Sequence, residues 1–175
     1  GPTIEAIDPV RYISNFSSGK QGYEIANCAY TYGAETILIT GPTNIEVPEV
    51  NKIIKVESAE QMFNESMSIC KKYGSIDIAF LTAAVSDWKI NKTEKKYKKN
   101  ENIFKQIKFT ENKDILHMIS NLKKNRPKIV CGFATETSSL INNARKKLIN
   151  KNCDFIFANK ISNKFNPMGN DFNEI

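Results

Sequence analysis

Apolar and polar positions alternate in two different rhythms along most of this chain. Short runs of apolar residues predict strands, and apolar residues spaced three and four apart predict helices. The expected strands are Glu35 to Thr40, Lys52 to Val56, Ile76 to Ala84, Gln106 to Phe109, Lys128 to Phe133 and Asp154 to Ala158. The expected helices are Tyr23 to Tyr32, Ser58 to Gly74, Asp114 to Leu122 and Thr137 to Lys151.

This alternation of strands and helices predicts parallel βαβ units. We therefore expect an α/β fold, a Rossmann-like, doubly wound and mainly parallel sheet with helices on both faces, in one domain spanning residues 1–175. The runs Ile76 to Ala84 and Lys128 to Phe133 are almost continuously apolar, which predicts strands buried on both faces. Ser58 and Gln61 have the spacing of a capping box, which predicts a helix start.

Charge and cysteine content narrow the functional classes. The net charge is +6 and the isoelectric point is about 9.1, which favours anionic partners such as nucleotides or phosphorylated metabolites. The four cysteines, Cys28, Cys70, Cys131 and Cys153, are scattered and the chain has one histidine, so we expect reduced core thiols and no zinc site. No apolar run approaches the ~20 residues of a membrane span. These features predict a cytoplasmic protein that does not bind membranes.

A serine- and glycine-rich segment near the start is the first candidate for a binding site. Asn15, Ser17, Ser18 and Gly19 lead directly into the first expected helix. A loop of this kind directs unpaired backbone N–H groups to one point at the helix N-terminus. It therefore predicts a site for a phosphate or a carboxylate.

The ends of the expected strands supply further candidates. In a doubly wound sheet, ligands bind outside the carboxyl ends of the strands. Ala83, Ala84 and Asp87 follow one strand, and Phe133 ends another. Asp87 is suited to holding Mg²⁺ beside phosphates.

A run of lysines follows Asp87 and has two interpretations. Its members are Lys89, Lys92, Lys95, Lys96, Lys98 and Lys99. Charge runs are usually solvated surface segments. The position beside a strand end instead favours a cationic flap that closes on a triphosphate and neutralises charge developing at phosphorus.

Several of these segments together resemble one enzyme family. They are Ile7-Asp-Pro-Val-Arg-Tyr-Ile-Ser-Asn-Phe-Ser-Ser-Gly-Lys-Gln-Gly, Gly41-Pro-Thr, Ala83-Ala-Val-Ser-Asp, Lys96-Tyr-Lys-Lys, Gly132-Phe-Ala-Thr-Glu-Thr and Ala158-Asn. In this order they resemble phosphopantothenoylcysteine synthetase, also called phosphopantothenate–cysteine ligase, of coenzyme A biosynthesis. The Lys-x-Lys-Lys loop is the bacterial form, and bacterial members use CTP.

The resemblance implies a reaction, cofactors and partners. The carboxylate of 4′-phosphopantothenate attacks the α-phosphorus of CTP, pyrophosphate leaves, and the amine of L-cysteine captures the acyl-cytidylate. It also implies Mg²⁺, a homodimer, and an association in many bacteria with a flavin-dependent decarboxylase.

The same resemblance implies roles for individual residues. Asn15 holds the acyl group, and Lys96 or Lys95 is the flap lysine, because this loop is one residue longer than usual. Arg11 reaches the substrate phosphate of the neighbouring subunit, and Asp87 lies near the metal. Substrate contacts are implied for Ser17, Ser18, Gly19 and Ala84, and nucleotide contacts for Ala83, Asp87, Lys113, Asp114, Ile115, Leu116, Phe133, Lys147 and Lys151.

The chain also departs from the family pattern. Gly1-Pro2-Thr3 stands where the family has a strand running into Gly-Gly-Thr, and Asn112-Lys113-Asp114-Ile115 replaces Asn-Pro-Asp-Ile. We expect the chain to be truncated at both ends, and the lack of the first strand to expose a sheet edge.

Two other functions are weighed against the ligase. A nicotinamide-dependent reductase is disfavoured because no Gly-x-Gly-x-x-Gly occurs. A basic nucleic-acid-binding domain is disfavoured because Tyr97 is the one aromatic residue within the lysine run from Lys92 to Lys99. We therefore expect no nucleic-acid partner.

Overall fold

The structure is a computed structural model that describes residues 1–98, 107–161, 170 and 173–175. Its helices are α1 (Lys20–Thr31), α2 (Ala59–Tyr73), α4 (Ile115–Ser120) and α5 (Leu140–Lys151). Its strands are β1 (Ile4–Ala6), β2 (Tyr12–Ser14), β3 (Ile37–Thr40), β4 (Lys52–Lys55), β5 (Ile78–Leu81), β6 (Trp88–Ile90), β7 (Phe109–Glu111), β8 (Ile129–Glu136) and β9 (Phe155–Lys160).

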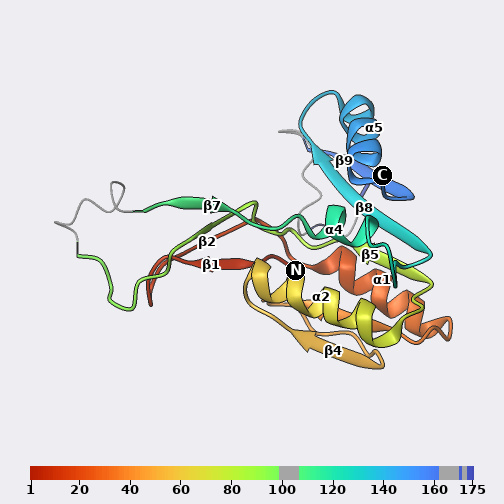
Figure 1. The fold of residues 1–175 in the computed structure, drawn as a ribbon, viewed down its shortest axis with the longest axis horizontal. Helices are drawn as coiled ribbons and strands as arrows, with labels where there is room; N and C mark the ends of the chain where they lie inside the picture. Colours follow the sequence, from red (N-terminus) through yellow and green to blue (C-terminus); the bar gives the residue numbers. More distant parts are fainter. Residues whose placement is uncertain (99–106, 162–169, 171–172) are drawn as a thin grey trace.

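An α/β body and a projecting arm make up the described chain (Figure 1). The body contains the helices with β3, β4, β5, β8 and β9, and the arm contains β1, β2, β6 and β7. In the body, β3 pairs with β4, and β8 pairs with both β5 and β9, always in parallel. The predicted class, a mainly parallel α/β fold, is therefore confirmed.

The parallel strands form two separate sheets in the described part of the chain. One has the order β3–β4 and the other the order β5–β8–β9, so that β3 and β5 are both edge strands. On β5, Ile78 is 47% exposed and Phe80 is 42% exposed. The expectation of a strand buried on both faces is therefore wrong for this segment, because Ile78 and Phe80 alternate onto one face of β5 that the described residues leave partly uncovered. β3 and β5 are sheet edges, but the expectation that a missing first strand exposes one of them stays a prediction.

The first residues of the chain lie between the ends of these two edge strands. Pro2 forms an isolated parallel bridge with Ala84, and the N–H of Thr3 donates to the Ala84 carbonyl over 3.4 Å. A Cβ at Gly41 would lie 1.8 Å from the Pro2 carbonyl oxygen, so this turn requires glycine. The contact fixes the start of the arm against the carboxyl ends of β3 and β5.

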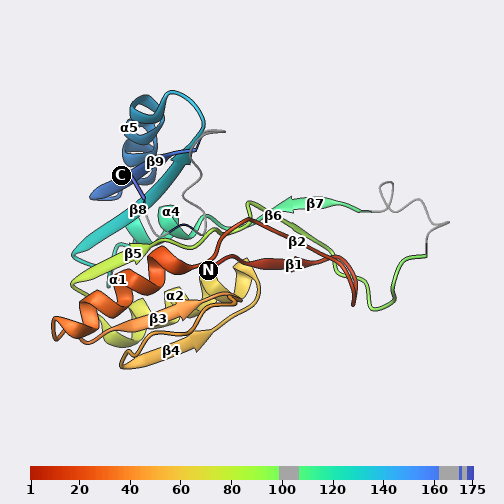
Figure 2. The ribbon, with the colours of Figure 1, turned by 180° about the vertical axis from the view of Figure 1, so that it is seen from behind.

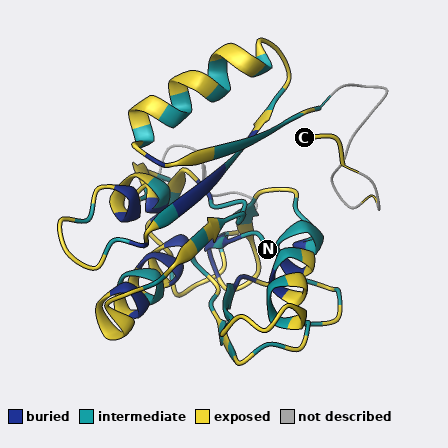
Figure 3. Cartoon of the chain, turned by 90° about the vertical axis from the view of Figure 1, so that its right-hand side faces the viewer, coloured by how far each residue is buried: buried dark blue, intermediate teal, exposed yellow. Residues whose placement is uncertain are grey.

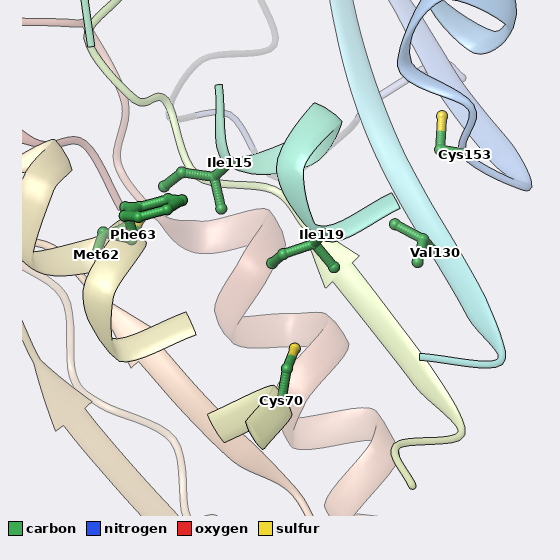
Figure 4. Close-up of a cluster of buried hydrophobic side chains, with 7 residues drawn as sticks. All are labelled: Met62, Phe63, Cys70, Ile115, Ile119, Val130 and Cys153. Carbon is green, nitrogen blue, oxygen red and sulfur yellow. The ribbon is translucent and has the colours of Figure 1, made fainter. Parts of the chain in front are cut away.

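One hydrophobic cluster joins α2, α4 and β8 (Figure 4). Its buried members are Met62, Phe63, Cys70, Ile115, Ile119, Val130 and Cys153. Val130 is completely buried, and the consecutive residues Val130, Cys131 and Gly132 are all buried, which confirms the expected burial on both faces of β8 (Figure 3). By contrast, α5 has no buried residue and covers β8 and β9 with one partly buried face.

The observed helix ends match the predicted ones where local capping residues determine them. The hydroxyl of Ser58 accepts from the Gln61 N–H, and the Gln61 side chain accepts from the Ser58 N–H over 3.2 Å, so the predicted capping box is present. Gly74 ends α2 in a left-handed conformation with φ of 67°. The start of α5 is later than expected, because Ser139 takes a left-handed conformation and the helix begins at Leu140, not Thr137.

The arm is the main feature that the hydrophobic pattern did not predict. β1 pairs antiparallel with β2, β6 pairs antiparallel with β7, and β1 lies beside β6. β7 begins at Phe109, where the expected strand ends, and Gln106 lies outside the described residues. Figure 2 shows the four strands leading away from the body together.

All four cysteines are free, as expected. Cys70, Cys131 and Cys153 are buried, but Cys28 is exposed on α1, so its assignment to the core is wrong. Burial raises the pKa of the three buried thiols. Among the described helices, none has the length and apolar character needed to cross a membrane.

Candidate functional site

Asn15 joins the loop before α1 to the segment that follows β5. Its side-chain nitrogen donates to the carbonyl oxygens of Val85, 3.0 Å away, and Ala84, 3.4 Å away. The side-chain oxygen accepts no hydrogen bond from any described residue, and Asn15 is exposed. The structure thus brings Asn15 to Ala84, as the strand-end argument predicted, and leaves an amide oxygen available as an acceptor.

The serines beside Asn15 bond to N–H groups of their own loop, which we had expected to be unpaired. The Ser17 hydroxyl accepts from the Gly19 N–H, and the Ser18 hydroxyl accepts from the Lys20 N–H, each over 3.3 Å. Two of the N–H groups expected to be unpaired therefore have partners within the loop. Gly19 adopts φ of 79°, and a Cβ there would lie 2.7 Å from Thr43, so a side chain at this position would be both strained and crowded.

A second group of residues lies where α4 and α5 meet the middle of β8, which continues past the expected end at Phe133 to Glu136. The ammonium group of Lys147 donates to the Phe133 carbonyl oxygen over 2.7 Å. The ammonium group of Lys151 pairs with Asp114, whose other carboxylate oxygen accepts from the His117 N–H over 2.8 Å. Asp114 therefore caps α4 and holds a lysine of α5. Four residues expected at a nucleotide site are brought together here.

Burial and charge shift the pKa of two groups in this cluster. Burial lowers the pKa of Lys147, and Lys151 adds to the effect, while the carboxylates of Asp114, Glu136 and Asp87 oppose it. Burial acts to raise the pKa of Asp114, but the hydrogen bond from His117 and the charge of Lys151 outweigh it and the pKa is lowered. The partly buried ammonium of Lys147 is a cationic group that an anionic ligand would stabilise further, against the repulsion from the nearby carboxylates.

Asp87 lies between the two groups. The Asn112 N–H donates to its backbone oxygen over 2.8 Å, while its exposed carboxylate has no hydrogen-bond partner among the described residues. The electrostatic effect of Asp87 on Lys147 links it to the α5 cluster. Among the described residues no group of three or more His, Cys, Asp or Glu side chains could hold a metal. One unpaired carboxylate fits Mg²⁺ of the kind that is bound mainly through substrate phosphates.

Other residues with an expected nucleotide role pack inside the body. Ile115 is buried in the core cluster, and Ala83 and Leu116 pack against it. A Cβ on Gly132 would lie 2.6 Å from the Leu116 side chain, which shows how closely α4 covers β8. The Lys113 ammonium lies 4.4 Å from the centre of the Phe63 ring. Ile115 and Leu116 can therefore face a ligand only through their backbone.

The described lysines of the run and Arg11 lie on the arm, not at the ends of β5 and β8. Residues 91–98 lead to the far end of the arm, away from α5 (Figures 1 and 2). Lys89, nearer the body, pairs with Glu60 of α2 over 3.4 Å. The structure therefore does not bring Lys95 and Lys96 to Lys147 within one chain. Lys99 lies outside the described residues.

Three contacts at these sites were missed in the sequence. Asp8 pairs with Arg11 in the turn between β1 and β2. The Asn143 side chain donates to Glu136 over 2.8 Å, and the Thr135 hydroxyl donates to Asn159 over 2.8 Å. The Asp-Pro-x-Arg sequence is a turn signal that could have identified the first contact. The other two depend on how β8, α5 and β9 pack, which local sequence does not specify.

Comparison with known proteins identifies relatives of this chain. The chain is 43% identical over 163 residues to the coenzyme A biosynthesis bifunctional protein CoaBC of Haemophilus influenzae, covering 93% of this chain and 40% of that protein. It thus spans about 40% of the length of such curated relatives. The crystal structure of the C-terminal domain of CoaBC superposes with a TM-score of 0.75 at 37% identity, covering 91% of this chain and 73% of that one.

A more distant solved structure has the same fold. A Cab2 mutant in complex with phosphopantothenate-cysteine superposes with a TM-score of 0.72 at 15% identity, covering 92% of this chain and 70% of that chain. The family described as "DNA/pantothenate metabolism flavoprotein C-terminal domain" matches residues 1–175. The chain therefore belongs to the DNA/pantothenate metabolism flavoprotein C-terminal domain family.

Proposed function

We propose that this chain is a ligase of coenzyme A biosynthesis that joins 4′-phosphopantothenate to L-cysteine with CTP in the cytoplasm. The observation that carries the proposal is the cluster of Lys147 and Lys151 between β8 and the start of α4, close to the unpaired carboxylate of Asp87. It provides cationic groups for a triphosphate and an oxygen ligand for its metal ion. Similarity to CoaBC over 93% of the chain supports the choice of reaction.

The nucleotide is proposed to lie along α4 and the end of β8. Lys147 and Lys151 contact its phosphates, and Phe133 with the backbone of Asp114, Ile115 and Leu116 contacts its cytidine moiety. Lys113, at the start of α4, and Ala83, beside Asp87, border this site. Asp87 would hold Mg²⁺, whose chemical contribution is to neutralise phosphate charge.

The acyl substrate is proposed to lie against the loop before α1. The free side-chain oxygen of Asn15 can accept from an N–H of the substrate, while its nitrogen remains bound to Val85 and Ala84. Ser17, Ser18 and Gly19 form the opposite wall of this subsite. Since Asn15 binds the carbonyl oxygen of Val85, two residues before Asp87, the substrate carboxylate and the nucleotide phosphates can meet there.

The proposed chemistry has two steps. A carboxylate oxygen of phosphopantothenate attacks the α-phosphorus of CTP, the bond to the bridging oxygen breaks, and pyrophosphate leaves. The neutral amine of cysteine then attacks the acyl carbon, CMP leaves with the bonding electron pair, and the amine loses a proton. Cationic side chains stabilise the charge on the leaving groups in both steps.

We propose further that the arm forms a homodimer, which would bring the lysines of one chain to the site of the other. The arm exposes apolar side chains, with Tyr12 and Phe109 both 59% exposed on its two outer strands. Unpaired strand edges with exposed aromatic residues are suited to pairing with a second copy. In this arrangement Lys96, or Lys95, contacts the triphosphate, and Arg11 faces the neighbouring chain.

The dimer has its own test. Phe109→Lys should shift the sedimentation coefficient from dimer to monomer, and Tyr32→Lys, an equally drastic change on α1 in the body, should leave the dimer intact. A wild-type chain that sediments as a monomer at concentrations that support turnover would contradict this assembly.

CoaBC of Haemophilus influenzae is named as a bifunctional protein, and we propose a flavin-dependent decarboxylase as the functional neighbour of this ligase.

Detection of the product tests the function itself. The protein should form phosphopantothenoylcysteine, identified by mass spectrometry, from phosphopantothenate, cysteine, Mg²⁺ and CTP. Omitting any one of these should abolish the product. Faster formation with ATP than with CTP would contradict the nucleotide assignment alone, and no product with either nucleotide would contradict the ligase.

A further inference from the structure

The turn between β1 and β2 is built around the carboxylate of Asp8, whose side chain is 0% exposed. One of its oxygens accepts from the N–H groups of Val10 and Arg11, over 2.8 and 2.9 Å. The other accepts from the Arg11 guanidinium, with Nε 2.9 Å away. These contacts fold residues 8–11 back on themselves and fix the direction of the arginine side chain.

The same ion pair also holds the lysine run. The second oxygen of Asp8 accepts from the Tyr97 N–H over 3.2 Å, and Arg11 Nη2 donates to the Tyr97 carbonyl oxygen over 2.9 Å. Both backbone groups of Tyr97 are therefore bound by one ion pair that lies 86 and 89 residues away in sequence. The backbone of the lysine run is therefore attached to the arm at this point.

A second attachment lies four residues earlier. The Thr93 N–H donates to the Ile7 carbonyl oxygen over 3.1 Å, and the Thr93 hydroxyl donates to the Lys95 carbonyl oxygen over 3.0 Å. The backbone is thus fixed on both sides of Lys95 and Lys96. Their side chains are exposed, and their ammonium groups have no partner among the described residues.

We propose that Asp8 and Arg11 are positioning residues that hold the backbone of Tyr97 and so place Lys96 for contact with the triphosphate. This inference rests on the proposed function. A fixed backbone presents the lysine at little cost in entropy when the anion binds. Arg11 then acts through Tyr97, in place of the direct contact with a substrate phosphate that the family resemblance implies.

Arg11→Met separates this role from the turn. The contacts of Asp8 with the N–H groups of Val10 and residue 11 do not depend on the arginine side chain, so the turn should survive. Arg11→Lys should behave like Arg11→Met, because a single ammonium cannot reproduce the fork that bridges Asp8 and the Tyr97 carbonyl. Arg145→Met is the matched control, because Arg145 is exposed on α5 and has no hydrogen bond to a described residue.

Hydrogen exchange in the protein without ligands is the first measurement. In Arg11→Met the Tyr97 N–H keeps Asp8 as its acceptor, but the bond from Arg11 to the Tyr97 carbonyl oxygen is lost and the backbone there is held less firmly. The Tyr97 amide should therefore exchange roughly 10-fold faster or more, with the Thr93 amide much less affected. Arg145→Met should leave both amides unchanged. Unaltered exchange at Tyr97 would overturn the proposal whether or not the protein is a ligase.

Steady-state kinetics is the second measurement. Arg11→Met should lower kcat roughly 10-fold, with little change in KM for phosphopantothenate. Lys96→Gln should then lower kcat much less in the Arg11→Met variant than it does in the wild type. A raised KM with unchanged kcat would instead assign Arg11 to the substrate phosphate. Faster exchange with unchanged kcat and KM would also overturn the positioning role. A wild type with no ligase activity would contradict the proposed function, and exchange at Tyr97 would still decide whether the attachment exists.

Discussion

The side-chain nitrogen of Asn15 lies 3.0 Å from the backbone carbonyl oxygen of Val85 and donates a hydrogen bond to it. This contact joins the loop before α1 to the segment after β5, two regions that are 70 residues apart in sequence. It also orients the amide so that its oxygen is the group available to a ligand. The proposed substrate subsite depends on this orientation.

Asn15→Asp tests that subsite. The substitution removes the donor and places a carboxylate against the Val85 and Ala84 carbonyl oxygens, so we expect product formation to be nearly abolished. Because Asn15 is exposed, the free energy of unfolding should fall by only about 1 kcal/mol, the usual net contribution of a hydrogen bond. Turnover and urea denaturation check both effects. Asn27→Asp, which adds the same charge on the surface of α1, should keep wild-type turnover, and an active Asn15→Asp would contradict the role of this residue.

Lys96→Gln tests the lysine of the arm. Its charge is expected to act mainly when the triphosphate is attacked, so kcat should fall roughly 10²-fold while the affinity for CTP changes much less. Initial rates and equilibrium binding of CTP separate the two quantities. Lys92→Gln, at an exposed position on the same loop, is the control. Equal losses in both variants, or no loss when Lys95 and Lys96 are both replaced, would favour a merely solvated charge run.

Lys147 gives a pH dependence with a definite sign. Its pKa in the folded protein is lowered from 10.5 by burial, so the unfolded chain binds this proton more strongly. The free energy of unfolding contributed by Lys147 therefore rises with pH between the folded and unfolded pKa values. The stability of wild type relative to Lys147→Met should increase over that window and then level off above the unfolded pKa. A difference that stays constant, measured by urea denaturation, would contradict the burial of this ammonium.

The contribution of Asp8 to stability also rises with pH, but it does so in the acid range. Burial acts to raise the pKa of its carboxyl group, but the hydrogen bonds from Arg11, Val10 and Tyr97 outweigh burial and hold the pKa well below its usual range. Its contribution to stability is complete above the unfolded pKa and is lost as the pH falls through the folded pKa. The stability advantage of wild type over Asp8→Asn should thus be constant from neutral pH to about pH 4 and narrow below it. An advantage that disappears near pH 6 would rule out this carboxylate as its source.

Local signals in the sequence predicted much of the body. The capping box of Ser58 and Gln61 and the apolar run of β8 lead directly to structure that is present. The prediction was wrong for the run containing Ile78 and Phe80, because an apolar strand has the same sequence whether one or both of its faces are covered. Burial there is decided by what packs on each face of the strand, and this information is not local.

The arm could not be predicted for a related reason. β1, β2 and β6 have three residues each, too few for the alternation of a strand to be recognised. Their pairing depends on contacts such as that between Asp8 and Tyr97, which are far apart in sequence. Of the residues that the resemblance implies at the site, Lys151 and Asp114 do meet, whereas Lys96 lies on the arm.

Release of pyrophosphate tests the central claim most directly. With CTP and Mg²⁺, the protein should release pyrophosphate when phosphopantothenate is added and should form the ligated product only when cysteine is also present. Replacing both Lys147 and Lys151 by Met should abolish the release. Release that does not require phosphopantothenate, or no release with any nucleoside triphosphate, would contradict the account.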